Sequence, residues 1–400
     1  MAAFVRCPLQ APTHTKTASS FQAAPLGHVS SETSSSAMLK AAAVLFLLAA
    51  VSPVVSSQSY NAIFSFGDSI SDTGNLCTNG CPSWLTTGQP PYGNTYFRRP
   101  TGRCTDGRIV IDFLADHFGL PMLPPSKASG GEFKKGANMA IIGATTMDFD
   151  FFQKHGLGNS IWNNGPLGTQ IQWFQQLTPS ICGTDSDCKS YFNNSLFIVG
   201  EFGGNDYNAP IFSGKVSMAE IRTWVPQIID TIASGVETLI GLGAVEVVVP
   251  GVLPIGCFPL YLTLYPSSNK DDYDEIGCLK SFNDLSSYHN DLLKTAVSRL
   301  QSKYPGARLM YADFYAQVAD MVRSPDKFGL KYGLKVCCGA GGQGSYNYNN
   351  GKRCGMPESS ACDDPENYLV WDGIHLTDAA YNAIADGWLD GTYCSPGILR

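Results

Sequence analysis

Short apolar runs alternate with amphipathic stretches along most of this chain. The runs are "NAIFSF", "GANMAIIGA", "SLFIVGEF", "AVEVVVPG" and "ARLMYADF". Uninterrupted apolar runs of this length are typical of strands buried on both faces. Helical patterns fall near residues 107–118, 166–177, 219–241, 281–303 and 378–390. This order predicts a doubly wound α/β fold, with a mostly parallel five-stranded sheet between two layers of helices.

The composition limits the kind of partner that the chain can have. Of its 400 residues, 44% are hydrophobic and only 15% are charged, which is typical of a globular protein with a large core. The net charge is −7, and no run is rich in Lys or Arg. We therefore expect neither nucleic acid nor an anionic membrane as the main partner. A small-molecule or polymeric neutral substrate fits this charge better, while the oligomeric state stays open.

The N-terminal segment has the pattern of a secretory signal. Lys40 precedes the apolar run 41–51, and the small residues 55–57 offer a cleavage site before Gln58. The run is too short to span a bilayer comfortably, so we expect no stable membrane insertion. The pattern predicts a leader over residues 1–57, followed by a single domain over residues 58–400.

A polar stretch lies ahead of this signal. Because signal peptides rarely begin with such a stretch, we interpret Met38 as the start, residues 38–57 as the signal peptide and residues 1–37 as an upstream extension. The alternative is a transit peptide, since "TKTASSFQAA" and "SSETSSS" are rich in Ser and Thr. The first interpretation predicts a protein of the secretory pathway, either extracellular or kept in the Golgi or vacuole.

The cysteine count agrees with secretion. Removing Cys7 with the leader leaves twelve of the thirteen cysteines, enough for up to six disulfides in an oxidising compartment. Local pairs at Cys182 with Cys188 and Cys257 with Cys278 are plausible. A rival interpretation is a metal site formed by Cys337, Cys338, Cys354 and Cys362. Secretion favours disulfides there.

One glycosylation acceptor supports the same compartment. Asn193-Asn194-Ser195 has the N-x-S pattern, although such triplets also arise by chance. Asn193 is therefore a glycosylation candidate only.

Polar residues directly follow three of the apolar runs. Gly67-Asp68-Ser69 follows the first, Gly143 ends the second, and Gly203-Gly204-Asn205-Asp206 follows the third. In a doubly wound sheet the carboxyl ends of the strands form the ligand site. Each segment taken alone is more simply an ordinary turn.

The histidines make the combination more specific. Outside the leader, His117 and His289 lie in amphipathic helical patterns, and His155 has no carboxylate at useful spacing. His375 lies three residues after Asp372, just before a helix start at Thr377. One short loop can then bring the carboxylate to one ring nitrogen while the other faces a nucleophile. The alternative is an Asp-Gly turn with a helix-capping histidine.

These segments together resemble the GDSL esterase/lipase family, also called SGNH hydrolases, and the plant secreted branch most closely. The resemblance is carried by Phe66-Gly67-Asp68-Ser69 with Asp72, Gly74 and Asn75, by Gly136-Ala137-Asn138 with Gly143, by Gly203 to Asp206, and by Asp372 to His375. Four blocks in this order are far more specific than any one of them. Ile70 replaces the leucine of the family name, and Met139 stands where Phe is frequent.

The resemblance implies an SGNH-hydrolase fold and a role for each residue. Ser69 would be the nucleophile, His375 the base and Asp372 the acid that orients it. Ser69, Gly143 and Asn205 would form the oxyanion hole. The chemistry agrees, because a serine hydroxyl needs a base and the tetrahedral intermediate needs donors aimed at its negative charge.

The sequence therefore predicts a secreted serine carboxylic-ester hydrolase that cleaves acyl esters, acetyl esters among them, through an acyl-enzyme. We expect no cofactor and no metal, because the chain has no P-loop, no H-E-x-x-H and no G-x-S-x-G elbow. Two alternatives remain. One is an acyltransferase that uses the same Ser69, His375 and Asp372, and the other is a catalytically silent binding protein.

Overall fold

A central six-stranded sheet organises the structure. The computed structural model describes residues 58–162, 165–341 and 346–400. Five strands run parallel in the order β2-β1-β3-β4-β5, and β10 joins the β5 edge antiparallel. Their bounds are β1 Ile63–Phe66, β2 Gly136–Asn138, β3 Leu196–Val199, β4 Glu246–Pro250, β5 Arg308–Ala312 and β10 Cys394–Ser395.

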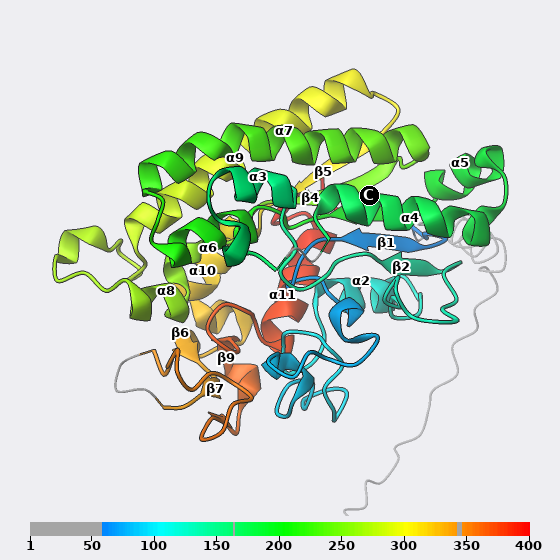
Figure 1. Cartoon of the computed structure of the whole chain (residues 1–400). Coiled ribbons are helices and arrows are strands. Elements are labelled where there is room, and N and C mark those ends of the chain that lie inside the picture. The colour runs from blue at the N-terminus through cyan, green and yellow to red at the C-terminus, as the bar shows by residue number, and fades with distance from the viewer. Residues whose placement is uncertain (1–57, 163–164, 342–345) are drawn as a thin grey trace, which may run out of the picture. The chain divides into compact units, whose positions relative to one another are not determined.

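Helices cover both faces of this sheet. Figure 1 shows α4, α7 and α9 on one face and α2 and α11 on the other. The helix bounds are α2 Val110–His117, α3 Phe149–Lys154, α4 Leu167–Cys182, α5 Asp185–Asn193, α6 Gly204–Ser213, α7 Met218–Leu242, α8 Pro259–Leu264, α9 Lys280–Lys303, α10 Phe314–Arg323 and α11 Asp378–Leu389. The predicted doubly wound α/β fold is therefore confirmed.

Two details of the sheet differ from the sequence prediction. The second apolar run is a strand only over β2, although the Met139 and Ile141 N–H groups beyond it still donate to the Ser65 and Gly67 carbonyls. The sixth strand, β10, pairs over only two residues. So short a segment carries no apolar run by which the sequence could reveal it.

The C-terminal part adds two small sheets beside the main one. One pairs β6 (Tyr332–Val336) with β9 (Tyr368–Val370), and the other pairs β7 (Cys338–Gly339) with β8 (Ser360–Ala361). Disulfides Cys337–Cys362 and Cys338–Cys354 cross-link this part. The four cysteines of the rival metal site are thus paired with one another as disulfides, as secretion favoured.

The remaining cysteines form three disulfides and two free thiols. Both predicted local pairs are present, and a further disulfide joins Cys77 to Cys81. Cys104 and Cys394 are buried and free. Five of the six conceivable disulfides therefore form among the described residues, because these two thiols are each enclosed separately.

The predicted leader over residues 1–57 lies outside the described part of the chain. Within the described ranges, no helix combines the length and the apolar character needed to cross a bilayer. Asn193, the glycosylation candidate, lies exposed at the end of α5.

Candidate active site

The nucleophile turn begins where β1 ends, at the carboxyl edge of the sheet. Gly67 has φ +153°, and a Cβ there would lie 3.0 Å from the carbonyl oxygen of Gly200, so only glycine fits this close approach. Gln170 of α4 accepts from the Gly67 N–H at 3.0 Å and donates to its carbonyl at 2.8 Å. This amide-to-amide pair holds the turn that carries Ser69.

The base loop follows β9 and ends at the start of α11. Thr377 caps that helix by accepting from the Ala380 N–H, so the loop stops two residues after His375. Asp372 Oδ1 accepts from the backbone N–H of His375 at 3.1 Å, which folds the loop so that the carboxylate lies under the imidazole.

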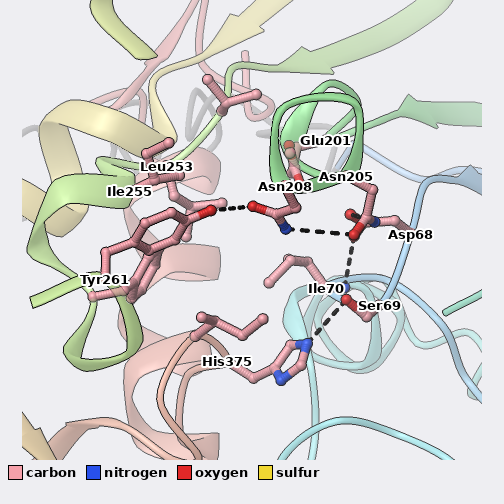
Figure 2. A pocket seen from close by; sticks show the side chains of 14 residues that line it. Asp68, Ser69, Ile70, Glu201, Asn205, Asn208, Leu253, Ile255, Tyr261 and His375 are labelled. Carbon is pink, nitrogen blue, oxygen red and sulfur yellow. Dashed lines mark hydrogen bonds between the residues drawn. The ribbon is translucent and has the colours of Figure 1, made fainter. Parts of the chain in front are cut away.

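Ser69, His375 and Asp372 come together as the sequence predicted. His375 Nε2 lies 2.9 Å from Ser69 Oγ (Figure 2). Its Nδ1 lies 2.8 Å from Asp372 Oδ2 and 2.9 Å from Oδ1. Hydrogen bonds at both ring nitrogens align the base with the nucleophile, which is the arrangement that activates a serine hydroxyl.

The charges of His375 and Asp372 depend on one another. Burial disfavours the imidazolium, but attraction to Asp372 outweighs burial and raises the pKa of His375 well above its ordinary value. Burial likewise opposes ionisation of Asp372, yet His375 and hydrogen bonds lower the pKa of this carboxyl. Asp372 therefore stays ionised, and its negative charge stabilises the protonated form of His375.

Two further side chains contact this group, and neither was predicted. Tyr92 is buried, and its hydroxyl donates to Asp372 Oδ2 at 2.7 Å. The Cys104 thiol lies close enough to His375 to contribute to the raised pKa of the imidazole. Burial raises the pKa of Cys104, so the thiol stays neutral. Both lie far from the base loop in sequence and outside the four motif blocks, so no local pattern pointed to them.

The sequence predicted two backbone oxyanion donors, the N–H groups of Ser69 and Gly143. Among the described residues, neither the Ser69 nor the Gly143 N–H has a hydrogen-bond acceptor. Gly143 has φ +81°, and a Cβ there would lie 2.6 Å from the ring of Trp162. A side chain at this position would therefore displace the ring beside the loop.

Asn205 lies beside these groups, but its amide has acceptors already. Its Nδ2 donates to Asp68 Oδ2 at 2.7 Å and to the Ala144 carbonyl at 2.9 Å. An amide nitrogen carries two hydrogens, so both are engaged in this arrangement. To serve an oxyanion, Asn205 must exchange one of these bonds for the substrate.

A buried acid pair lies behind the nucleophile turn. Asp68 and Glu201 bring two carboxyls close enough to interact electrostatically, and both carboxyls are almost fully buried. Burial raises the pKa of Asp68 to about 6 and, together with repulsion from Asp68, raises the pKa of Glu201 well above its ordinary value. Glu201 is therefore the protonated partner, and the ionised Asp68 keeps the N–H side of Asn205 turned toward itself.

Asp206 and Asp72 tie the surrounding loops together. Asp206 accepts from the backbone N–H groups of Thr146 and Met147 at 2.7 and 2.9 Å. Asp72 accepts from the Ile142 N–H at 2.9 Å and from three N–H groups of its own turn. Both carboxylates thus support the loop that carries Gly143 and do not face the nucleophile.

The other histidines lie away from this site. His117 ends α2, and His155 contacts the Phe151 carbonyl. His289 is buried in α9 against the Tyr207 hydroxyl at 2.7 Å, and burial lowers its pKa to about 3. The sequence prediction that His117 and His289 belong to helices is confirmed.

A small cavity opens beside the nucleophile and the base. Its volume is about 50 Å³. The lining residues are Asp68, Ser69, Ile70, Glu201, Gly204, Asn205, Asn208, Val252, Leu253, Ile255, Phe258, Tyr261, Ile374 and His375. Within the described ranges, no group of three or more His, Cys, Asp or Glu side chains is arranged to hold a metal ion.

Comparison with known proteins gives a consistent result. The family model "GDSL-like Lipase/Acylhydrolase" matches residues 63–388. A GDSL esterase/lipase of Arabidopsis thaliana is 44% identical over 355 residues, covering 87% of this chain and 89% of the relative. A second from the same plant is 43% identical over 367 residues, covering 90% and 98%.

One solved structure also matches, though weakly. Phospholipase A1 from Streptomyces albidoflavus NA297 is 12% identical, with a TM-score of 0.35, over 82% of this chain and 99% of that one. A likeness at this level carries no statement about substrate.

Proposed function

The chain belongs to the GDSL-like lipase/acylhydrolase family, and from that premise we propose that it is a secreted serine carboxylic-ester hydrolase that works through an acyl-enzyme. The observation that carries this proposal is the contact of 2.9 Å between His375 Nε2 and Ser69 Oγ, with Asp372 on the opposite ring nitrogen. A binding protein without activity would not need that alignment.

The reaction follows from these contacts. His375 Nε2 removes the hydroxyl proton as Ser69 Oγ attacks the ester carbonyl, and the Ser69 and Gly143 N–H groups stabilise the oxyanion. His375 then protonates the leaving alcohol, which departs and leaves the acyl group on Ser69. A water molecule, activated by the same imidazole, releases the acid and restores the enzyme.

The acyl-enzyme can be tested directly. We expect incubation with p-nitrophenyl acetate, followed by an acid quench, to leave an acetyl group on the peptide that contains Ser69, as read by mass spectrometry. His375→Ala should show no such group, because the nucleophile then lacks its base. An acetyl group on a different residue would contradict this mechanism. Adding a primary alcohol separates the rival acyltransferase, which would form a new ester in preference to acetate.

We propose Asn205 as the third oxyanion donor, because it lies beside the turn that carries Ser69. If Asn205 exchanges its bond to the Ala144 carbonyl for the oxyanion, Asn205→Ala should lower kcat about 10²- to 10³-fold and change KM only slightly. Ser213→Ala, at the end of the same helix α6, is the matched control for kcat, because Ser213 does not line the cavity. Full turnover by Asn205→Ala, with a normal thermal melt, would leave the oxyanion to the two backbone donors.

Secretion is supported by the disulfides and by the signal pattern ahead of Gln58. The protein purified from its source should begin at or near Gln58. Thiol titration after denaturation without reductant should detect only Cys104 and Cys394. An N-terminus upstream of Met38, or twelve free thiols, would contradict this part of the proposal.

A further inference from the structure

The geometry around Ser69 decides where each part of an ester lies. After attack, the central carbon carries Ser69 Oγ, the oxyanion, the alcohol oxygen and the acyl chain. The oxyanion faces the Ser69 and Gly143 N–H groups, and the alcohol oxygen must reach His375 Nε2 to receive a proton. The acyl chain takes the remaining direction. The cavity beside Ser69, which Gly143 does not line, is the space in that direction.

The far wall of this cavity is apolar and rigid. Val252, Leu253, Ile255 and Phe258 come from the segment between β4 and α8, and each is at most 6% exposed. Cys257 within this segment is held by its disulfide to Cys278. An apolar wall suits a hydrocarbon chain, and a wall pinned in this way has little freedom to retreat.

A polar contact closes the wall at one side. The Tyr261 hydroxyl donates to Asn208 Oδ1, which joins α8 to α6 across the cavity (Figure 2). Tyr261 is 1% exposed and its ring packs against Phe282 of α9. The cavity is therefore bounded on the side where a long chain would have to continue.

The volume then limits the chain length. One water-sized atom needs roughly 10–15 Å³ of such space, so a cavity of about 50 Å³ holds about three to five non-hydrogen atoms. Beyond the carbonyl carbon, an acetyl chain adds one carbon, a butyryl chain three and an octanoyl chain seven. Acetyl and butyryl groups fit, and octanoyl does not.

We propose that the wall formed by residues 252–261 restricts this enzyme to esters of short acyl chains, of about four carbons or fewer. This inference rests on the proposed ester hydrolysis. The size limit therefore acts on the acyl part of the ester.

Three p-nitrophenyl esters test the limit, because they share a leaving group and differ only in the acyl chain. For the mature enzyme we expect kcat/KM for the acetate and the butyrate to exceed that for the octanoate at least about 100-fold, since the extra methylenes have no space. The octanoate must be assayed below its micelle concentration, so that the free ester is compared.

A change in the wall should change the ratio. Ile255→Ala removes three carbons from the wall, and we expect it to raise kcat/KM for the octanoate relative to the acetate about tenfold. Ile255→Val is the milder variant if the alanine variant unfolds, and it should shift the ratio in the same direction. Ile228→Ala in α7 is the matched control, because Ile228 is equally buried and does not line the cavity.

The outcomes distinguish failure of the chain-length limit from failure of the proposed ester hydrolysis. Equal hydrolysis of octanoate and butyrate by the unaltered enzyme would overturn the chain-length limit and leave the proposed function standing. The limit would also be overturned if Ile255→Ala and Ile228→Ala gave the same ratio as the unaltered enzyme. Hydrolysis of none of the three esters would overturn the proposed function, and the limit with it.

Discussion

The two halves of the catalytic group are held in place by different parts of the molecule. Ser69 follows β1, which pairs with β2 and β3 inside the main sheet, and Gln170 of α4 fixes the turn before it. His375 follows β9 of the small two-stranded sheet, outside the main one. The proposed nucleophile is thus positioned by the main sheet, and the proposed base by a separate small sheet.

Contacts from several directions hold the segment that carries Asp372 and His375. The backbone N–H of Trp371, just before the loop, donates to the His375 carbonyl at 2.8 Å, and the Trp371 ring meets Tyr92 edge to face. Disulfides Cys337–Cys362 and Cys338–Cys354 cross-link the neighbouring strands. A loop outside the main sheet can hold a proposed base accurately when hydrogen bonds and disulfides fix its position.

The largest expected effect comes from the nucleophile itself. Ser69→Ala should lower kcat about 10⁵- to 10⁶-fold, and Ser69→Ala with His375→Ala should be little worse, because the two halves act as a unit. Thermal melts should stay close to that of the unaltered enzyme. Ser71→Ala, in the same turn, is the control and should keep nearly full activity. Additive losses in the double variant would mean that the halves act independently.

The next effect concerns the carboxylate of the base half. Asp372→Asn should lower kcat about 10⁴-fold, because the imidazole loses its orientation and its counter-charge. The negative charge of Asp372 raises the pKa of His375, so its removal lowers that pKa. Activity requires the neutral imidazole, and the acid limb of kcat/KM should therefore move to lower pH. Asp364→Asn is the control, and an unmoved limb would indicate another partner for His375.

A smaller effect should follow from the hydroxyl that steadies this carboxylate. Tyr92→Phe removes the hydrogen bond to Asp372 Oδ2, and a bond to a charged group contributes about 1.5–3 kcal/mol, so kcat should fall roughly 10- to 100-fold. KM should change little, since Tyr92 does not line the cavity. Tyr311→Phe is the matched control, because Tyr311 is buried and its hydroxyl has no partner among the described residues. Equal kinetics in the two variants would remove Tyr92 from the positioning role.

The smallest effect on turnover should come from removing the disulfide Cys338–Cys354. Replacing Cys338 and Cys354 with serine opens a loop whose ends are 16 residues apart, and the free energy of unfolding should fall by about 3 kcal/mol. We expect kcat to fall severalfold as the base loop loosens. The same change at Cys182 and Cys188, beside α4, should leave kcat unaltered. Equal kcat losses in the two double-serine variants would show that the disulfides near His375 matter no more for turnover than the disulfide beside α4.

Much of the site was predictable because its motifs are local. Asp372 and His375 lie three residues apart, and the backbone of one short loop brings them together. Ser69 and Gly143 follow apolar runs, and the carboxyl ends of parallel strands lie at the same edge of the sheet. Pattern and spacing therefore indicate these residues without knowledge of the packing.

The residues that sequence reasoning missed act across long separations. Tyr92 reaches Asp372 over 280 positions, and Gln170 reaches Gly67 over 103. Tyrosine and glutamine are common residue types, and neither carries a local signature of a role in positioning. The acid pair of Asp68 and Glu201 likewise forms only when the ends of β1 and β3 come together.

The amino-acid sequence by itself indicated the alternation of strands and helices, two local disulfides, and Ser69, His375 and Asp372 as the proposed nucleophile, base and carboxylate, since each depends on local pattern and short spacing. Only the tertiary structure decided how the remaining cysteines pair, how the Asn205 amide is engaged, and how much room lies beside Ser69. These depend on side chains from distant segments meeting at distances of a few ångströms. The space left between such side chains is a property of their packing, which no single segment encodes.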